Sequence, residues 1–83
     1  MADVVANERR SLSTVSSGHN VRLTQVNGGR KLSRRLLALG LAVGDQFEVL
    51  HHRSSGVVVA KEGNRVALGL GVAEKLMVEM VDD

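Results

Sequence analysis

The chain first alternates between apolar and polar residues at positions 21–26. Val21 and Leu23 fall on one side of an extended chain and polar residues fall on the other, which predicts a half-buried strand. The alternation fails over the last two positions, which indicates a bulge or the end of the strand. Two glycines at 28–29 then break this element from the next one.

Residues 30–39 have the period of a helix. Leu32, Leu36 and Leu39 recur at i, i+4 and i+7, so one side is apolar and is expected to pack on the core. The opposite side is one continuous basic face, formed by Arg30, Lys31, Arg34 and Arg35.

Three residues complete the prediction for this helix. Leu37 lies beside the basic face rather than among the other leucines, which places it at the rim of the core or on the surface as a contact residue. Gly40 follows the last leucine where a left-handed C-cap is expected, and Leu41 would then fold back over the helix end.

The second half of the chain reads as β structure. Alternating or β-branched runs predict four strands, at 46–51, 57–60, 65–70 and 76–81. In the first of these runs, Phe47, Val49 and His51 share one face. Gly63-Asn64 is a favoured two-residue hairpin pair between the second and third runs, and residues 71–75 suggest one helical turn.

Five short strands and one longer helix predict a mainly β fold, a small five-stranded barrel with the helix inserted after the first strand. At 83 residues the chain is expected to form one domain, over 11–81. Ser11 would cap a short turn at its start, with Leu12 and Val15 directed into the core. Residues 1–10 are interpreted as a frayed tail, and 82–83 as a second tail.

Composition removes several classes of function. The chain has no Cys, which excludes disulfide scaffolds and thiol catalysis. Its single aromatic residue, Phe47, argues against a stacking platform for single-stranded nucleic acid. The most apolar stretch, 36–43, is far shorter than the roughly 20 residues that a membrane-spanning helix needs.

Charge is unevenly distributed along the chain although the formal net charge is only +2. Residues 9–44 contain seven basic residues and no acidic one, whereas the part after them is mildly acidic. This partition predicts one electropositive surface, suited to an acidic protein, a lipid headgroup layer or a phosphate backbone.

Candidate catalytic chemistry is sparse. The sequence has no phosphate-binding loop of the GxxxxGK[ST] type, no GxSxG elbow and no HExxH helix. Ser54 and Ser55 lie next to a His pair but have no Asp nearby in sequence. His51 and His52 would point to opposite faces of a strand, so they do not readily share an ion. We therefore assign no catalytic residue, no metal site and no cofactor.

Several segments together resemble the FeoA family, ferrous iron transport protein A. The run Arg-Arg-Leu-Leu-Ala-Leu-Gly-Leu-Ala-Val-Gly at 34–44 has the family's Leu-Gly-Leu-x-x-Gly pattern, and an alternating strand follows it at 45–50. Residues 66–68 and 73–79 resemble the family's closing pattern. The chain departs from many members at 55–57, where Ser-Gly-Val stands in place of Gly-Asp-Pro.

The resemblance implies an SH3-like barrel and a non-enzymatic, cytoplasmic role in bacterial ferrous iron uptake. The implied partner is the permease FeoB, which carries a cytosolic GTPase domain, with peripheral contact to the inner membrane as an additional expectation. No nucleic acid and no small-molecule substrate are expected. The residues expected to bind the partner are Arg30, Lys31, Arg34, Arg35 and Leu37.

Two other readings stay open at this point. One is a small metal-binding chaperone or sensor for iron or zinc, in which His19, His51 or His52 would act with carboxylates. The other is a basic small-barrel module that binds nucleic acid through its cationic helix.

Overall fold

A computed structural model describes residues 9–81 of the chain. Its elements, in chain order, are β1 (Arg9–Ser11), η2 (Leu12–Thr14), β2 (Asn20–Val26), α1 (Gly29–Ala38), β3 (Gln46–Arg53), β4 (Gly56–Lys61), β5 (Asn64–Gly69), α2 (Leu70–Ala73) and β6 (Leu76–Met80).

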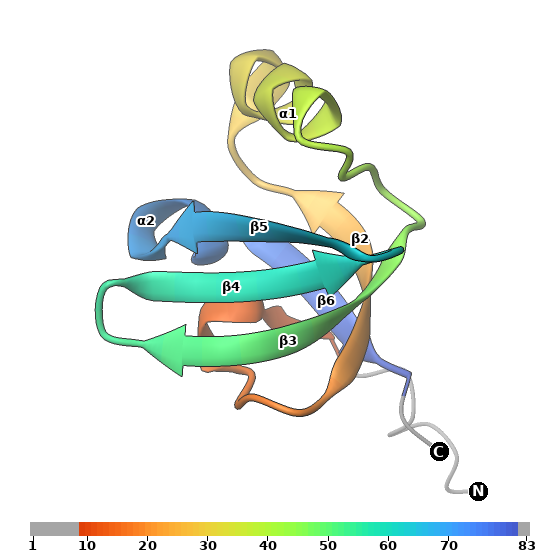
Figure 1. Ribbon diagram of the computed structural model, residues 1–83. Coiled ribbons are helices and arrows are strands. Elements are labelled where there is room, and N and C mark those ends of the chain that lie inside the picture. The colour runs from red at the N-terminus through yellow and green to blue at the C-terminus, as the bar shows by residue number, and fades with distance from the viewer. Residues whose placement is uncertain (1–8, 82–83) are drawn as a thin grey trace, which may run out of the picture.

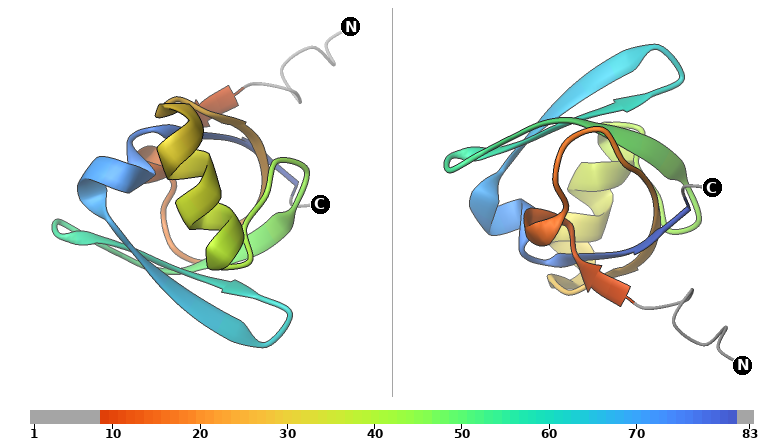
Figure 2. Two further views of the ribbon diagram at one scale, coloured as in Figure 1. Left: turned by 90° about the horizontal axis from the view of Figure 1, so that it is seen from above. Right: turned by 90° about the horizontal axis from the view of Figure 1, so that it is seen from below.

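All strand pairs are antiparallel, and they form one sheet in the order β1-β6-β2-β3-β4-β5. The sheet curls into a small barrel with α1 standing over one mouth (Figures 1 and 2). The predicted mainly β, SH3-like fold with a helix after the first long strand is therefore confirmed.

The number of strands is one more than the five predicted. The additional strand, β1, lies at Arg9–Ser11 and pairs with β6, with Arg10 opposite Val78. Arg9 and Arg10 therefore belong to the sheet and not to the tail expected over 1–10. The remaining tail residues, 1–8 and 82–83, lie outside the described part of the chain.

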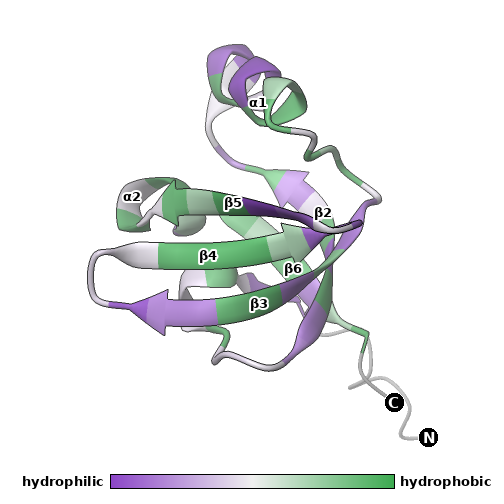
Figure 3. Cartoon of the chain, viewed as in Figure 1, coloured by the Kyte–Doolittle hydropathy of each residue, from purple (hydrophilic) through white to green (hydrophobic). Residues whose placement is uncertain are grey.

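One apolar core fills the barrel, and every strand from β2 to β6 contributes to it. The buried side chains are Leu12, Val15, Val21, Leu23, Leu36, Leu41, Phe47, Val49, Val57, Val59, Leu68, Ala73, Leu76 and Val78. Figure 3 shows the matching contrast between apolar strands and the hydrophilic outer side of α1. Ser11 caps η2 by accepting a hydrogen bond from the Ser13 amide, as expected for the turn that buries Leu12.

Two irregularities in register change which side chains reach the core. The β2–β6 pairing shifts between Leu23 and Gln25, close to where the alternation in sequence fails. The β3–β4 pairing shifts between Val49 and His51. The expectation that His51 shares the buried face of Phe47 and Val49 is therefore wrong, because the extra residue turns His51 to solvent.

The β4–β5 hairpin turns one residue earlier than predicted. Lys61 pairs with Asn64, so the two turn residues are Glu62 and Gly63 rather than Gly63-Asn64. Their φ angles are +49° and +86°. A two-residue turn of this kind needs positive φ at both positions and favours glycine at the second, which explains the register.

The end of α1 follows the predicted glycine cap. Gly40 has φ +88°, its amide donates to the Leu37 carbonyl at 2.9 Å, and the Leu41 amide donates to the Leu36 carbonyl at 2.8 Å. These two bonds form a Schellman motif and return Leu41 to the core, where it is 1% exposed. Leu39, which was expected in the core, is 47% exposed, because Leu41 covers the helix end instead.

Candidate functional site

The basic face of α1 (Arg30, Lys31, Arg34 and Arg35) is exposed along its whole length. Among the described residues, Arg22–Glu79 and Lys61–Asp45 form ion pairs, each with an N–O distance of 2.7 Å. Neither involves the basic face, and within residues 9–81 none of its four cations makes an ion pair. The predicted electropositive surface therefore stands open to solvent.

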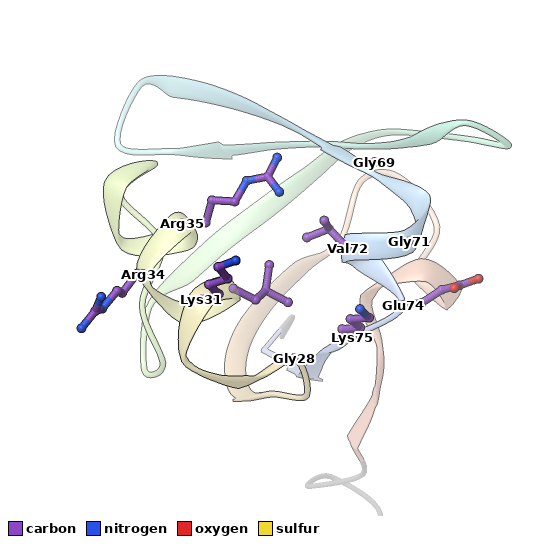
Figure 4. Close-up of a pocket in the computed structure, with 10 residues that line it drawn as sticks. Gly28, Lys31, Arg34, Arg35, Gly69, Gly71, Val72, Glu74 and Lys75 are labelled. Carbon is purple, nitrogen blue, oxygen red and sulfur yellow. The ribbon is translucent and has the colours of Figure 1, made fainter.

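An open groove of about 950 Å³ lies between α1 and α2 (Figure 4). Its floor is apolar, since Leu32 of α1 and Val72 of α2 both line it. Its rim carries four cations and one acid, and the residues concerned are Lys31, Arg34, Arg35, Lys75 and Glu74. In Figure 4 the Arg35 side chain extends toward β5, whereas Glu74 points away from the groove.

The groove uses three of the five residues predicted for partner binding. Lys31, Arg34 and Arg35 line it, but Arg30 and Leu37 do not. Leu37 is 59% exposed on the surface of α1, which agrees with its expected place outside the apolar stripe.

Lys75 is a fourth cation of the groove that sequence reasoning missed. It belongs to the acidic half of the sequence, 45 positions after Arg30. The Asn27 amide donates to the Lys75 carbonyl at 2.7 Å, which brings the segment after α2 beside the start of α1. Only this long-range pairing places Lys75 near the basic face, so no local pattern could have revealed it.

The apolar floor extends from this groove along the side of α1. A smaller hollow of about 60 Å³ continues it, lined by Leu32, Arg35, Leu36, Leu39, Ala67, Leu68, Gly69 and Val72. We call the two together the α1–β5 cleft. The exposed Leu39 thus has a place in the structure as part of the cleft wall.

Gly28 and the Asp45–Lys61 ion pair lie at the two ends of α1, and the Lys61 ammonium also donates to the Gly40 carbonyl just after the helix. Gly28 lies against Leu32 so closely that a Cβ at this position would collide with the Leu32 side chain. At the other end, Asp45 accepts hydrogen bonds from the Ala42 amide at 2.8 Å and from Lys61 Nζ at 2.7 Å. The Lys61 ammonium and the Ala42 amide lower the pKa of Asp45 below its ordinary 3.8.

The histidines lie apart from the cleft. His51 and His52 are exposed near the end of β3, and His19 is half-buried before β2. Within residues 9–81, no three His, Cys, Asp or Glu side chains gather in a way that could hold a metal ion. Ser54 and Ser55 form the β3–β4 turn; the departure from the FeoA pattern at 55–57 runs from this turn into the start of β4 and lies outside the cleft.

Over residues 9–81, neither α1 nor α2 is long and apolar enough to cross a bilayer.

Comparison with known proteins gives a consistent set of matches. The family model for the FeoA domain matches residues 10–80. A Methanocaldococcus jannaschii protein that carries the name Fe(2+) transport protein A is 28% identical over 68 residues, which are 82% of this chain and 83% of that protein.

Solved structures agree with the sequence matches. The crystal structure of an iron uptake regulatory protein (FeoA) superposes with a TM-score of 0.82 at 27% identity, over 89% of this chain and 100% of that one. A manganese-dependent transcriptional repressor gives a TM-score of 0.81 at 19% identity, over 90% of this chain but 43% of the repressor. The second likeness shows the fold alone.

Proposed function

Because the chain belongs to the FeoA family, we propose that it is a non-enzymatic accessory protein of ferrous iron uptake. In this proposal it works in the cytoplasm and binds the cytosolic GTPase part of the FeoB permease. The match to an Fe(2+) transport protein A and the likeness to an iron uptake FeoA structure support the pathway. The partner is the one that the family resemblance implies.

The observation that carries the proposal is the cationic rim over an apolar floor. Lys31, Arg34 and Arg35 have no ion-pair partner within residues 9–81, so an acidic surface can meet them without displacing existing pairs. Exposed ion pairs contribute only about 0–1 kcal/mol each. The charges therefore steer and orient the partner, while burial of Leu32 and Val72 in the interface prolongs the contact.

The same cations also suit a second role at the membrane. An anionic inner leaflet attracts basic residues held close to it, by about 1 kcal/mol for each Lys or Arg. We propose that contact with the leaflet helps to orient the protein beside the permease, with Arg30 and Leu37 on the part of α1 outside the cleft.

Charge reversal tests the proposal. Binding of the purified FeoB cytosolic part is measured at low and high salt for the wild type and for Arg34→Glu/Arg35→Glu. The expected result is at least about tenfold weaker binding at low salt, with a much smaller difference at high salt.

A matched control separates the local effect from that of net charge. Arg10→Glu/Arg53→Glu makes the same change of net charge at exposed positions outside the cleft. It should bind within about twofold of the wild type. Equal loss in both double variants, or no loss in either, would remove the basic face from the mechanism.

A further inference from the structure

The outer side of β5 has backbone groups that no other strand uses. β5 stands at one end of the sheet order, and within residues 9–81 only β4 pairs with it. An unpaired strand edge presents a row of N–H and C=O groups that can bind another extended chain. Natural folds usually protect such an edge from pairing with another chain, so the residues around it determine whether a partner strand can bind.

The ladder shows which residues of β5 point outward. In an antiparallel pair, alternate residues exchange hydrogen bonds with the neighbouring strand. The two-residue turn makes Lys61 and Asn64 a hydrogen-bonded pair. The Leu70 amide donates to the Ser55 carbonyl at 3.2 Å, so a second even-numbered residue also bonds toward β4. The even-numbered residues of β5 therefore bond to β4. The N–H and C=O groups directed outward belong to Arg65 and Ala67, whereas Gly69 offers only its N–H, because as the N-cap of α2 its carbonyl accepts the first hydrogen bond of that helix.

This free edge faces the α1–β5 cleft. Ala67 and Gly69 line the cleft together with Leu32 and Leu39, and Figure 1 shows α1 standing above β5 on that side. Both edge residues are small, so their backbone is approachable from the cleft. A Cβ built on Gly69 meets nothing within 4 Å, so the space beside it is open.

The charge around the edge selects the kind of chain that can lie there. The rim carries Lys31, Arg34, Arg35 and Lys75, and in Figure 4 the side chains of Arg34 and of the single acid, Glu74, point away from the groove. A second copy docked through the same face would bring an identical set of cations against this one. An acidic segment meets no such repulsion.

We propose that the free edge of β5 binds a partner's acidic, extended segment by strand addition inside the α1–β5 cleft. Backbone hydrogen bonds to Ala67 and Gly69 provide the pairing. Alternate side chains of the segment are apolar and rest on Leu32 and Val72, while its acidic residues face the cations of the rim. The inference deepens the proposed function and rests on it, because it names the element of the FeoB cytosolic part that would be recognised.

Amide hydrogen exchange gives a readout specific to strand addition. The full chain, labelled with ¹⁵N, is measured alone and with a saturating amount of the FeoB cytosolic part. The Ala67 and Gly69 amides should exchange at least about tenfold more slowly in the complex. The Val66 and Leu68 amides, which already bond to β4, should change much less.

Two variants test the same contacts by affinity. Ala67→Pro removes an outward N–H without removing a bond to β4, a position at which an edge strand tolerates proline. It should bind about tenfold more weakly, whereas the control Ala67→Ser, which keeps the N–H, should bind like the wild type. Gly69→Leu, for which the fold has room, should also weaken binding by filling the cleft. Thermal unfolding checks that each variant is folded.

The outcomes separate the two proposals. If the FeoB part binds but the alternating protection is absent, and Ala67→Pro and Gly69→Leu bind normally, strand addition is wrong and the proposed function stands. If the wild type does not bind the FeoB part at all, both proposals fall. If the chain alone sediments as a dimer in which Ala67 and Gly69 are already protected, the occupant is a second copy and the acidic-segment proposal is overturned.

Discussion

Leu36 is the side chain of α1 on which its attachment to the barrel depends most. It is 1% exposed and belongs to the single core cluster, whereas Leu32 is only partly buried against that cluster. Replacing a fully buried leucine by alanine costs about 2–5 kcal/mol, from lost transfer energy and the cavity left behind. A domain of this size is stable by only about 4–12 kcal/mol, so Leu36→Ala removes a large part of the free energy of unfolding.

Urea and thermal unfolding followed by circular dichroism measure this loss. With a shift of roughly 4–8 °C per kcal/mol, the midpoint of Leu36→Ala should fall by about 10 °C or more. Leu37→Ala is the matched control, because the same truncation at a side chain that is 59% exposed should stay within about 0.5 kcal/mol of the wild type. If the two variants lose similar stability, Leu36 is not the buried side of α1 and Leu37 is not its exposed side.

Three further changes probe the segments that fix α1. Gly40→Val should cost about 1–2 kcal/mol in urea unfolding, because φ +88° is strained for a side chain with a Cβ; a midpoint like the wild type would contradict the cap. Gly28→Ala should cost about 1 kcal/mol, because the Leu32 side chain must shift to make room for the added Cβ; an unchanged melting curve would contradict this close contact. The lowered pKa of Asp45 means that its charged form stabilises the fold above pH 3.8 and that this contribution is lost as the pH falls further. Asp45→Asn should therefore make the free energy of unfolding fall less steeply at acidic pH. A fall as steep as that of the wild type would exclude the Lys61 contact.

Short-range patterns predicted the parts of the fold that depend on short-range physics. The helix, the glycine cap and the β-branched strands each follow from residues within one or two turns of chain, and the structure places them within a few positions of the predicted limits. The cap even predicted the return of Leu41 to the core. Leu39 was predicted to be buried because the helical pattern was continued to this position. In the structure the helix ends at Ala38, and Leu39 is its C-cap.

The extra strand, the register shift in β3 and the cleft were missed because each depends on pairing with another segment of the chain. β1 has three residues and no alternation of its own, so only β6 defines it as a strand. The shift at Val49 depends on the partner strand, and it decides the side on which His51 lies. The cleft has the same origin, because Lys75 and Ala67 approach α1 only when the sheet is complete.

An open sheet edge beside an apolar groove would ordinarily favour self-association. Here the edge is short, Arg65 stands on it, and the cations of α1 surround the approach. Like charges on a second copy oppose pairing through this face, whereas an acidic chain is attracted to it. The concentration of basic residues before position 45 therefore has two consequences in the folded protein. It opposes pairing of β5 with β5 of a second copy, and it favours an acidic segment as the chain that β5 binds.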